Sequence, residues 1–261
     1  MFEARNLFNT VTPDANKQIT QQMGAFYVLE YVRDMSVTPN IAQTAYFCNL
    51  MNIRKRQVIC DLKKADITLQ SGAMQWMVGP VKVNTGITGA GDLAKKFVKG
   101  KASGESTIKP EYSGEEGILV LEPTYKHIIL SDIRDWGGKV ILDDGLFLAC
   151  EACIDNNIVS RSNISSALLG GEGLFNLCLS GDEGVFCIES PTPMSEIVEV
   201  YLKNDVLKID GNLAIAWSAS LSFTVERTTK TLIGSAASGE GLVNTYRGTG
   251  KVWMTPVKSS L

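Results

Sequence analysis

Histidine is nearly absent from this 261-residue chain, in which His127 is the only one. One imidazole cannot form a multi-histidine metal site, and it leaves little room for the general acid–base catalysis that enzymes build on histidine. The surrounding run from Tyr125 to Leu130 is rich in apolar and β-branched residues. The sequence therefore predicts that His127 lies on the face of a strand rather than in a catalytic centre.

Long apolar runs and a strong net charge are also missing. The apolar stretches fall well short of the roughly 20 residues that a membrane-spanning helix needs, and residues 1–15 lack the apolar core of a signal peptide. A net charge of −3 gives no general attraction to nucleic acid or to an anionic membrane. These absences predict a cytoplasmic protein that is not integral to a membrane.

The six cysteines are expected to be reduced, small core residues, as is usual in a cytoplasmic protein. Cys150 and Cys153 form a C-x-x-C pair, but a structural zinc site needs a second pair of ligands. Cys178 and Cys187 do not supply one, because they are nine residues apart. The alignment of the repeats described next predicts that Cys150 and Cys153 share one strand and face opposite sides of it.

Three short patterns recur in one order at intervals close to 67 residues. The first is a Gly-Glu pair, the second is a glycine before an apolar run, and the third is a glycine that opens each unit. Their positions are Gly104-Glu105, Gly171-Glu172 and Gly239-Glu240; Gly114, Gly181 and Gly248; and Gly72, Gly145 and Gly211. A fixed period of this length is the signature of a repeated structural unit.

Each unit consists of short strand-like runs between glycine turns, which favours a β-sandwich over a parallel α/β sheet. We therefore predict an all-β fold of three tandem β-sandwich-like modules with a short mixed N-terminal extension. The predicted boundaries are 1–65 for the extension, 66–135, 136–203 and 204–257 for the three repeats, and 258–261 for a tail. The extension should hold strands and one short helix, with Thr38 as its N-cap and Pro39 as its first residue.

The repeated glutamates Glu105, Glu172 and Glu240 are candidate metal ligands, because three carboxylates around a pseudo-threefold axis could hold a hard cation. The simpler interpretation is a turn glutamate that recurs because the module recurs. Basic residues gather at Arg54–Arg56 and again in the cluster Lys95, Lys96, Lys99 and Lys101. The second cluster is a candidate nucleic-acid contact, although most lysine clusters are simply solvated.

Several of these segments resemble one known family. Phe147–Cys150, Gly171–Phe175 and Lys208–Trp217, with the glycine hairpins, resemble the altered-inheritance-of-mitochondria type family, a bacterial domain of unknown function. The resemblance covers about residues 65–257. It implies a fold related to the tryptophan RNA-binding attenuation protein, with the module triplicated, and a homotrimer that presents nine modules in a ring. It implies no catalytic residues, and Ser106, Gly173 and Gly241 stand where a repeated basic residue would be needed to bind RNA.

Together these observations predict a non-enzymatic, homo-oligomeric scaffold or binding module without a cofactor. Its partner is expected to be a protein or a membrane-associated complex. The alternative is binding of RNA or a small ligand in grooves between the β modules. An enzyme ranks third, and its chemistry would use a metal held by the repeated glutamates.

Overall fold

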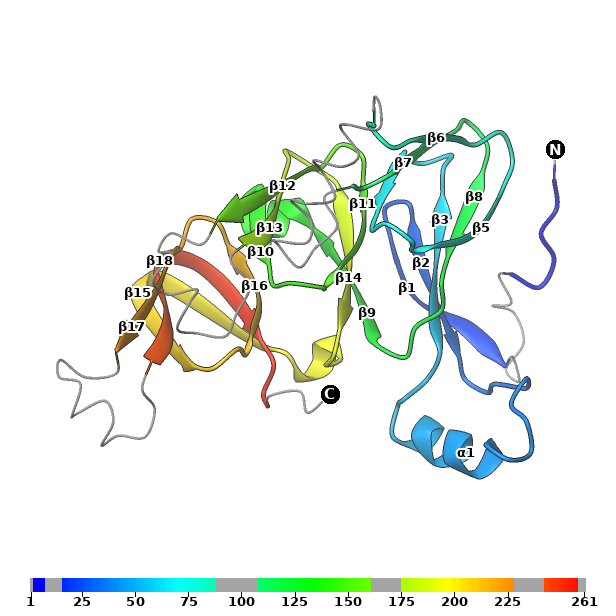
Figure 1. Cartoon of the computed structure of the whole chain (residues 1–261), viewed down its shortest axis with the longest axis horizontal. Coiled ribbons are helices and arrows are strands. Elements are labelled where there is room, and N and C mark those ends of the chain that lie inside the picture. Colours follow the sequence, from blue (N-terminus) through cyan, green and yellow to red (C-terminus); the bar gives the residue numbers. More distant parts are fainter. Residues whose placement is uncertain (1, 8–15, 88–107, 161–174, 228–241, 258–261) are drawn as a thin grey trace.

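Three antiparallel sheets and one α-helix make up the described part of the chain. The computed structural model describes residues 2–7, 16–87, 108–160, 175–227 and 242–257. The three sheets follow one another along the long axis of the molecule, with the N-terminal strands at one end (Figure 1). The prediction of a mostly β fold is confirmed.

The first sheet combines the N-terminal strands with strands from the first predicted repeat. Its order is β1 (Lys17–Met23), β2 (Phe26–Tyr31), β3 (Arg56–Asp61), β8 (Ile118–Leu121) and β5 (Met74–Val78). β1 and β2 form a hairpin that turns at Gly24, where φ is +53°. Because β3 pairs with β8, the last strand of the 1–65 segment is built into the same sheet as the strands that follow it.

The second sheet takes its strands from residues 67–190, and the third takes its strands from residues 139–254. The second has the order β6 (Lys82–Asn84), β7 (Glu111–Ser113), β4 (Ile67–Leu69), β11 (Phe147–Glu151), β14 (Val185–Ser190) and β9 (His127–Asp132). The third has the order β12 (Asp155–Ser160), β13 (Phe175–Ser180), β10 (Lys139–Leu142), β16 (Ala214–Ser218), β18 (Leu242–Met254) and β15 (Val198–Asp210), and β17 (Ser222–Arg227) pairs with β18. Two short 3-10 helices, η1 (Ile133–Trp136) and η2 (Met194–Glu196), lie in the connections.

The glycines that open the predicted units all adopt the same backbone conformation. Gly72, Gly145 and Gly211 have φ values of +84°, +74° and +71°, which L side chains rarely adopt. The next strand in each case is β5, β11 or β16, and each of these has a register shift near its start. The glycine pattern in the sequence therefore marks three turns that lead into three similarly bulged strands.

Apolar side chains fill the space between successive sheets. One core cluster joins the first sheet to the second, through residues such as Val58 and Leu119 on one side and Leu69 and Ala149 on the other. A second cluster joins the second sheet to the third. Further clusters cover the outer face of the first sheet, around Ile59, and the far side of the third. The second sheet is therefore packed on both faces.

The single α-helix of the described residues, α1 (Ala42–Leu50), is inserted between β2 and β3 and projects away from the sheets (Figure 1). The predicted helix is present, but it begins three residues later than expected, with Ile41 as its N-cap. The Thr38 hydroxyl bonds to the Asn40 side chain, and the Thr38 carbonyl accepts from the Ile41 N–H at 3.1 Å. Thr38 is thus used in a turn before the helix, so its side chain cannot cap α1. Within the described ranges, no helix has the length and apolar character of a membrane span.

Candidate functional site

The residues that the sequence offers as metal ligands and as nucleic-acid contacts lie outside the described residues. This applies to the glutamates Glu105, Glu172 and Glu240 and to the lysines Lys95, Lys96, Lys99 and Lys101. Among the residues that are described, no group of three or more His, Cys, Asp and Glu side chains could hold a metal ion. The metal and nucleic-acid hypotheses at these positions therefore stay predictions.

The C-x-x-C pair is divided between a strand and a turn. Cys150 is buried on β11, where burial raises the pKa of its thiol. The strand ends at Glu151, so Cys153 is exposed in the following turn, with its sulfur 3.5 Å from the Glu183 carbonyl oxygen. The expectation of one strand carrying both cysteines is therefore wrong. The turn is closed by a hydrogen bond from the Ile154 N–H to the Glu151 carbonyl oxygen at 3.0 Å. The Glu151 carboxylate also accepts from the backbone N–H groups of Ala25 and Val185, each at 2.9 Å.

His127 begins strand β9, as the sequence predicts. Its side chain is half-buried, and this burial, followed by the nearby charge of Arg56, lowers the pKa of the imidazole below its usual 6.5. Glu196 and Glu30 act in the opposite direction but are weaker. A neutral histidine at physiological pH fits a structural position on the sheet.

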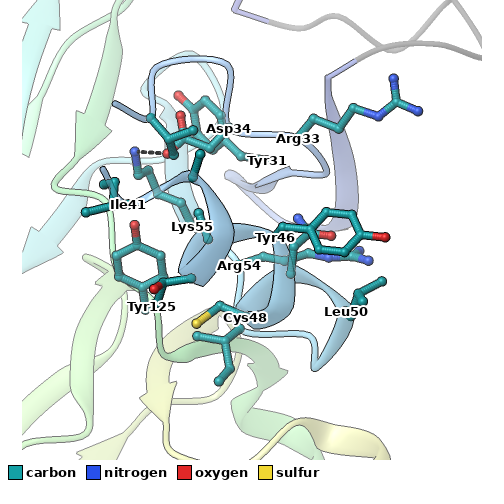
Figure 2. Close-up of a pocket in the computed structure, with 16 residues that line it drawn as sticks. Tyr31, Arg33, Asp34, Ile41, Tyr46, Cys48, Leu50, Arg54, Lys55 and Tyr125 are labelled. Atoms are coloured by element: carbon teal, nitrogen blue, oxygen red, sulfur yellow. Dashed lines mark hydrogen bonds and ion pairs between the residues drawn. The ribbon is translucent and has the colours of Figure 1, made fainter. Parts of the chain in front are cut away.

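A cavity of about 680 Å³ lies beside α1, at the end of the first sheet. Figure 2 shows its lining side chains, which come from α1, the end of β2, the segments before and after α1, and the segment between β8 and β9. Tyr31, Ile41, Ala45, Cys48 and Tyr125 provide much of the apolar lining. The cavity is thus bounded by segments that are far apart in the sequence.

The helix beside this cavity buries none of its own side chains. Large apolar and aromatic residues around it are instead between 48% and 75% exposed. We call this set the α1 patch, and it consists of Met35, Ile41, Tyr46, Phe47, Leu50, Met51, Ile53 and Tyr125. Isolated exposed apolar residues are ordinary, but a gathering of eight around one short helix is typical of a binding surface.

Arg56 holds α1 in place from the buried side. Its guanidinium, in a residue only 4% exposed, donates to the Glu30 carboxylate at 3.0 Å. The same group donates to the Asn52 backbone and side-chain oxygens at 3.0 and 2.9 Å, just after the helix. Backbone bonds between Arg56 and Thr124, at 2.7 and 2.8 Å, fix the segment that carries Tyr125. One residue therefore connects the helix end, β3 and the β8–β9 connection.

The basic residues that line the cavity are largely neutralised. Lys55 donates to Asp34 at 2.6 Å, and this hydrogen bond raises the pKa of the lysine and lowers that of the carboxyl group (Figure 2). Arg54 donates to Glu30 at 2.8 Å. Arg33 extends away from this cluster in the view shown (Figure 2). The cavity wall therefore combines apolar surface with paired charges and does not form a basic phosphate-binding surface.

Comparison with known proteins decides the family. The model of the mitochondrial biogenesis AIM24 family matches residues 50–257, which is most of the chain. The chain belongs to the AIM24 family. This confirms the resemblance inferred from the glycine motifs. The match to the AIM24 model begins at the last residue of α1, so half of the α1 patch, namely Met35, Ile41, Tyr46 and Phe47, lies in the part of the chain before it.

Two streptococcal proteins are similar to this AIM24-family chain. An uncharacterised protein of Streptococcus pyogenes serotype M6 is 29% identical over 194 residues, covering 72% of this chain and 75% of that protein. The X-ray crystal structure of a Streptococcus pyogenes protein is similar with a TM-score of 0.57 and 25% identity, covering 80% of this chain and 90% of that one. These relatives support the fold and the family, and they bring no activity with them.

The α1 patch is the feature that sequence reasoning missed. The sequence predicts the helix from its apolar residues, but it does not predict that these residues form an exposed surface. Tyr46, Phe47, Leu50 and Met51 are at positions i, i+1, i+4 and i+5, which places them on one side of a helix. The sequence therefore shows an apolar side, but tertiary contacts decide that this side is exposed instead of packed on the core.

Proposed function

We propose that the protein is a non-enzymatic, homo-oligomeric scaffold or binding module of the cytoplasm, and that the α1 patch is its partner-binding surface. Its partner would be a protein, either free or part of a membrane-associated complex. The observation that carries this proposal is that α1 has no fully buried side chain and that its large apolar residues Tyr46, Phe47 and Leu50 are each more than half exposed. A nine-residue helix is marginal in water by itself, so α1 gains stability when a partner covers the patch.

The charges around the patch favour a protein partner over nucleic acid. Lys55 and Arg54 are already paired with Asp34 and Glu30, so a phosphate backbone would have to compete with these carboxylates. Aromatic and methionine side chains, in contrast, are the groups enriched at protein–protein contacts. Tyr46, Phe47 and Met51 provide such groups at the exposed side of α1.

Site-specific photo-crosslinking in the host cell tests this function. A benzophenone amino acid at Phe47 should give a discrete cross-linked product, and the same group at Tyr201, a 70% exposed aromatic on β15, should not. Leu50→Asp should abolish the product at Phe47 without changing the oligomeric mass, because Leu50 is 63% exposed and adds no packing to the core. Equal patterns at both positions, or no product at Phe47, would contradict the proposal.

The cavity itself favours one alternative, which is binding of a small ligand. Its volume of about 680 Å³ falls in the usual range for ligand pockets, about 300–1,000 Å³. A resident ligand would give each chain extra mass in native mass spectrometry, and Ala45→Trp, which fills the cavity, would remove that mass. Bound RNA would instead raise the absorbance ratio of the purified protein at 260 and 280 nm.

We also propose that the three sheets arise from one triplicated module of the attenuation-protein type. Each unit would comprise six strand segments and would begin with β3, β9 or β15, so that β3 belongs to the first unit rather than to the extension. Support comes from the three glycine turns, from the three bulged strands, and from the family match that begins shortly before β3. A homotrimer would then present nine modules.

A further inference from the structure

Two strand segments at opposite ends of the molecule each lack, in the described part of the chain, the neighbouring strand that their counterparts in the middle of the chain have. β5 is the last strand of the first sheet and pairs only with β8. The second half of β15, residues 205–210, pairs only with β18. Unpaired edges present free backbone N–H and C=O groups, which another strand can use.

Edges of the same kind are paired at two places within the chain. β4 pairs with β11 where the first and second units meet, and β10 pairs with β16 where the second and third units meet. Both joints use the same flanking backbone hydrogen bonds, with lengths between 2.8 and 3.2 Å. The bonds, donor first, are Gln70 to Leu148 and Ala152 to Asp66 in one joint, and Asp143 to Ile215 and Ala219 to Lys139 in the other.

The two free edges are the halves of a third joint of this kind. β5 corresponds to β11 and β16, because all three follow a positive-φ glycine and share the register shift. Residues 205–210 correspond to β4 and β10, because each of these three segments precedes the positive-φ glycine of its unit. Each also pairs with the second strand of the hairpin that follows, which is β18 for residues 205–210, β7 for β4 and β13 for β10. One end of the molecule therefore carries the β4-type edge, and the other end carries the β11-type edge.

Side-chain exposure marks β5 as the strand that lacks its neighbour. On β11 the side chains from Phe147 to Cys150 are buried, and every residue of β16 is buried. On β5, in contrast, Trp76 is 37% exposed and Met77 is 40% exposed. An apolar edge strand in this state is a site for pairing with another chain.

We propose that the second half of β15 of one copy pairs with β5 of a second copy, antiparallel and in the register of the internal joints. Transferring that register places Ile209 opposite Trp76 and Leu207 opposite Val78. The backbone N–H of Asp210 would then donate to the Gln75 carbonyl. This interface rests on the homo-oligomer of the proposed function and specifies how its copies join.

The geometry of this joint restricts the assembly. The two edges differ, so the contact is heterologous, and each copy offers both halves of it. A heterologous contact closes into a ring when its rotation allows, and it otherwise continues as an open filament. The head-to-tail joint therefore supports a cyclic assembly such as a trimer, and it disfavours a two-fold dimer.

Disulfide trapping tests the register directly. Val78→Cys and Leu207→Cys are placed on separate chains, mixed and oxidised, in a parent in which Cys48 and Cys153 are serine to limit background. In the internal joints, the residue pairs equivalent to Val78 and Leu207 are the non-hydrogen-bonded pairs of the ladder. The Cα atoms of Val78 and Leu207 should therefore lie about 4.5 Å apart. That separation is within the range of about 4.4–6.8 Å that a disulfide accepts.

The matched control shifts the register by one residue. Met77→Cys mixed with Leu207→Cys should give little cross-link, because neighbouring side chains on a strand point to opposite faces. Native mass spectrometry of the parent and circular dichroism of each variant accompany the test. Under non-reducing denaturing conditions, we expect most of the protein in the Val78/Leu207 mixture to run as a covalent dimer. The fraction of covalent dimer in the control mixture should be at least five-fold lower.

The outcomes separate the interface from the oligomer. An oligomeric parent whose Val78/Leu207 mixture does not cross-link overturns the strand pairing and leaves the homo-oligomer standing. Equal cross-linking of both mixtures also overturns the register. A monomeric parent overturns both the interface and the homo-oligomeric part of the proposed function.

Discussion

Replacing Arg56 with methionine should strongly destabilise the protein and release α1. Arg56 is 4% exposed and Glu30 is 7% exposed, and the two are joined at 3.0 Å. Methionine keeps much of the apolar stem of arginine but removes the charge and the five donors. Glu30 would keep only Arg54, at 2.8 Å, and the Asn52 oxygens would lose both bonds to Arg56.

The expected loss of unfolding free energy is about 3–5 kcal/mol, the range for removing one partner of a buried ion pair. Urea unfolding followed by circular dichroism measures this loss. Hydrogen exchange adds a local readout, since the amides of α1 should exchange faster in Arg56→Met than in the wild type. Glu30→Gln should give a smaller loss than Arg56→Met, because Arg56 keeps its bonds to Asn52.

The matched control is the same substitution at an exposed ion pair. Arg5 pairs with Glu3 at 3.0 Å, and both side chains are more than 70% exposed. Arg5→Met should change the unfolding free energy by less than about 1 kcal/mol. If Arg56→Met costs no more than Arg5→Met, or leaves exchange in α1 unchanged, the argument that Arg56 anchors the helix is refuted.

Three further predictions follow from single residues. Burial lowers the pKa of His127, so the fold favours the neutral ring, and the wild-type unfolding free energy should fall as the pH drops below about 6.5. His127→Asn should weaken this fall. An NMR titration midpoint of His127 at or above 6.5 would contradict the lowered pKa. Gly24→Ala should cost clearly more unfolding free energy than Gly72→Ala, because a Cβ at Gly24 would clash with the Glu151 carboxylate and the Val185 side chain, whereas Gly72 has open space around it. Equal losses of unfolding free energy in urea would refute the clash. Burial also lowers the pKa of Lys251, so the fold disfavours its charged form. The unfolding free energy of the wild type, measured relative to Lys251→Met, should therefore rise as the pH increases toward 10.5. A decrease in this difference over the same pH range would contradict the prediction.

The strand framework was predictable because it is encoded locally. Glycine is the residue that tolerates the positive φ of Gly72, Gly145 and Gly211, so the turns before β5, β11 and β16 are visible in the sequence. The continuous apolar runs of β9 and β14 likewise follow from packing the second sheet on both faces. These features depend on a few adjacent residues, and for that reason pattern reasoning finds them.

The partnership between distant strands was not predictable in the same way. Nothing near β3 in the sequence states that it pairs with β8, more than 50 residues later. The α1 cavity has the same origin, since Tyr125 reaches it through backbone bonds between Arg56 and Thr124. The helix start was also missed, because the Thr38 hydroxyl bonds to Asn40 rather than to the helix. Tertiary contacts decide these strand pairings and the start of the helix, so local sequence propensity does not predict them.

Native mass spectrometry of the intact protein, purified gently from its host, tests the central claim most directly. A homo-oligomeric scaffold predicts a trimer, at about three times the chain mass of 28.3 kDa, with no added small molecule. A trimer with a constant extra mass would favour the ligand-binding alternative instead. A species at 28.3 kDa alone would contradict the assembly on which both the proposed function and the strand-edge interface depend.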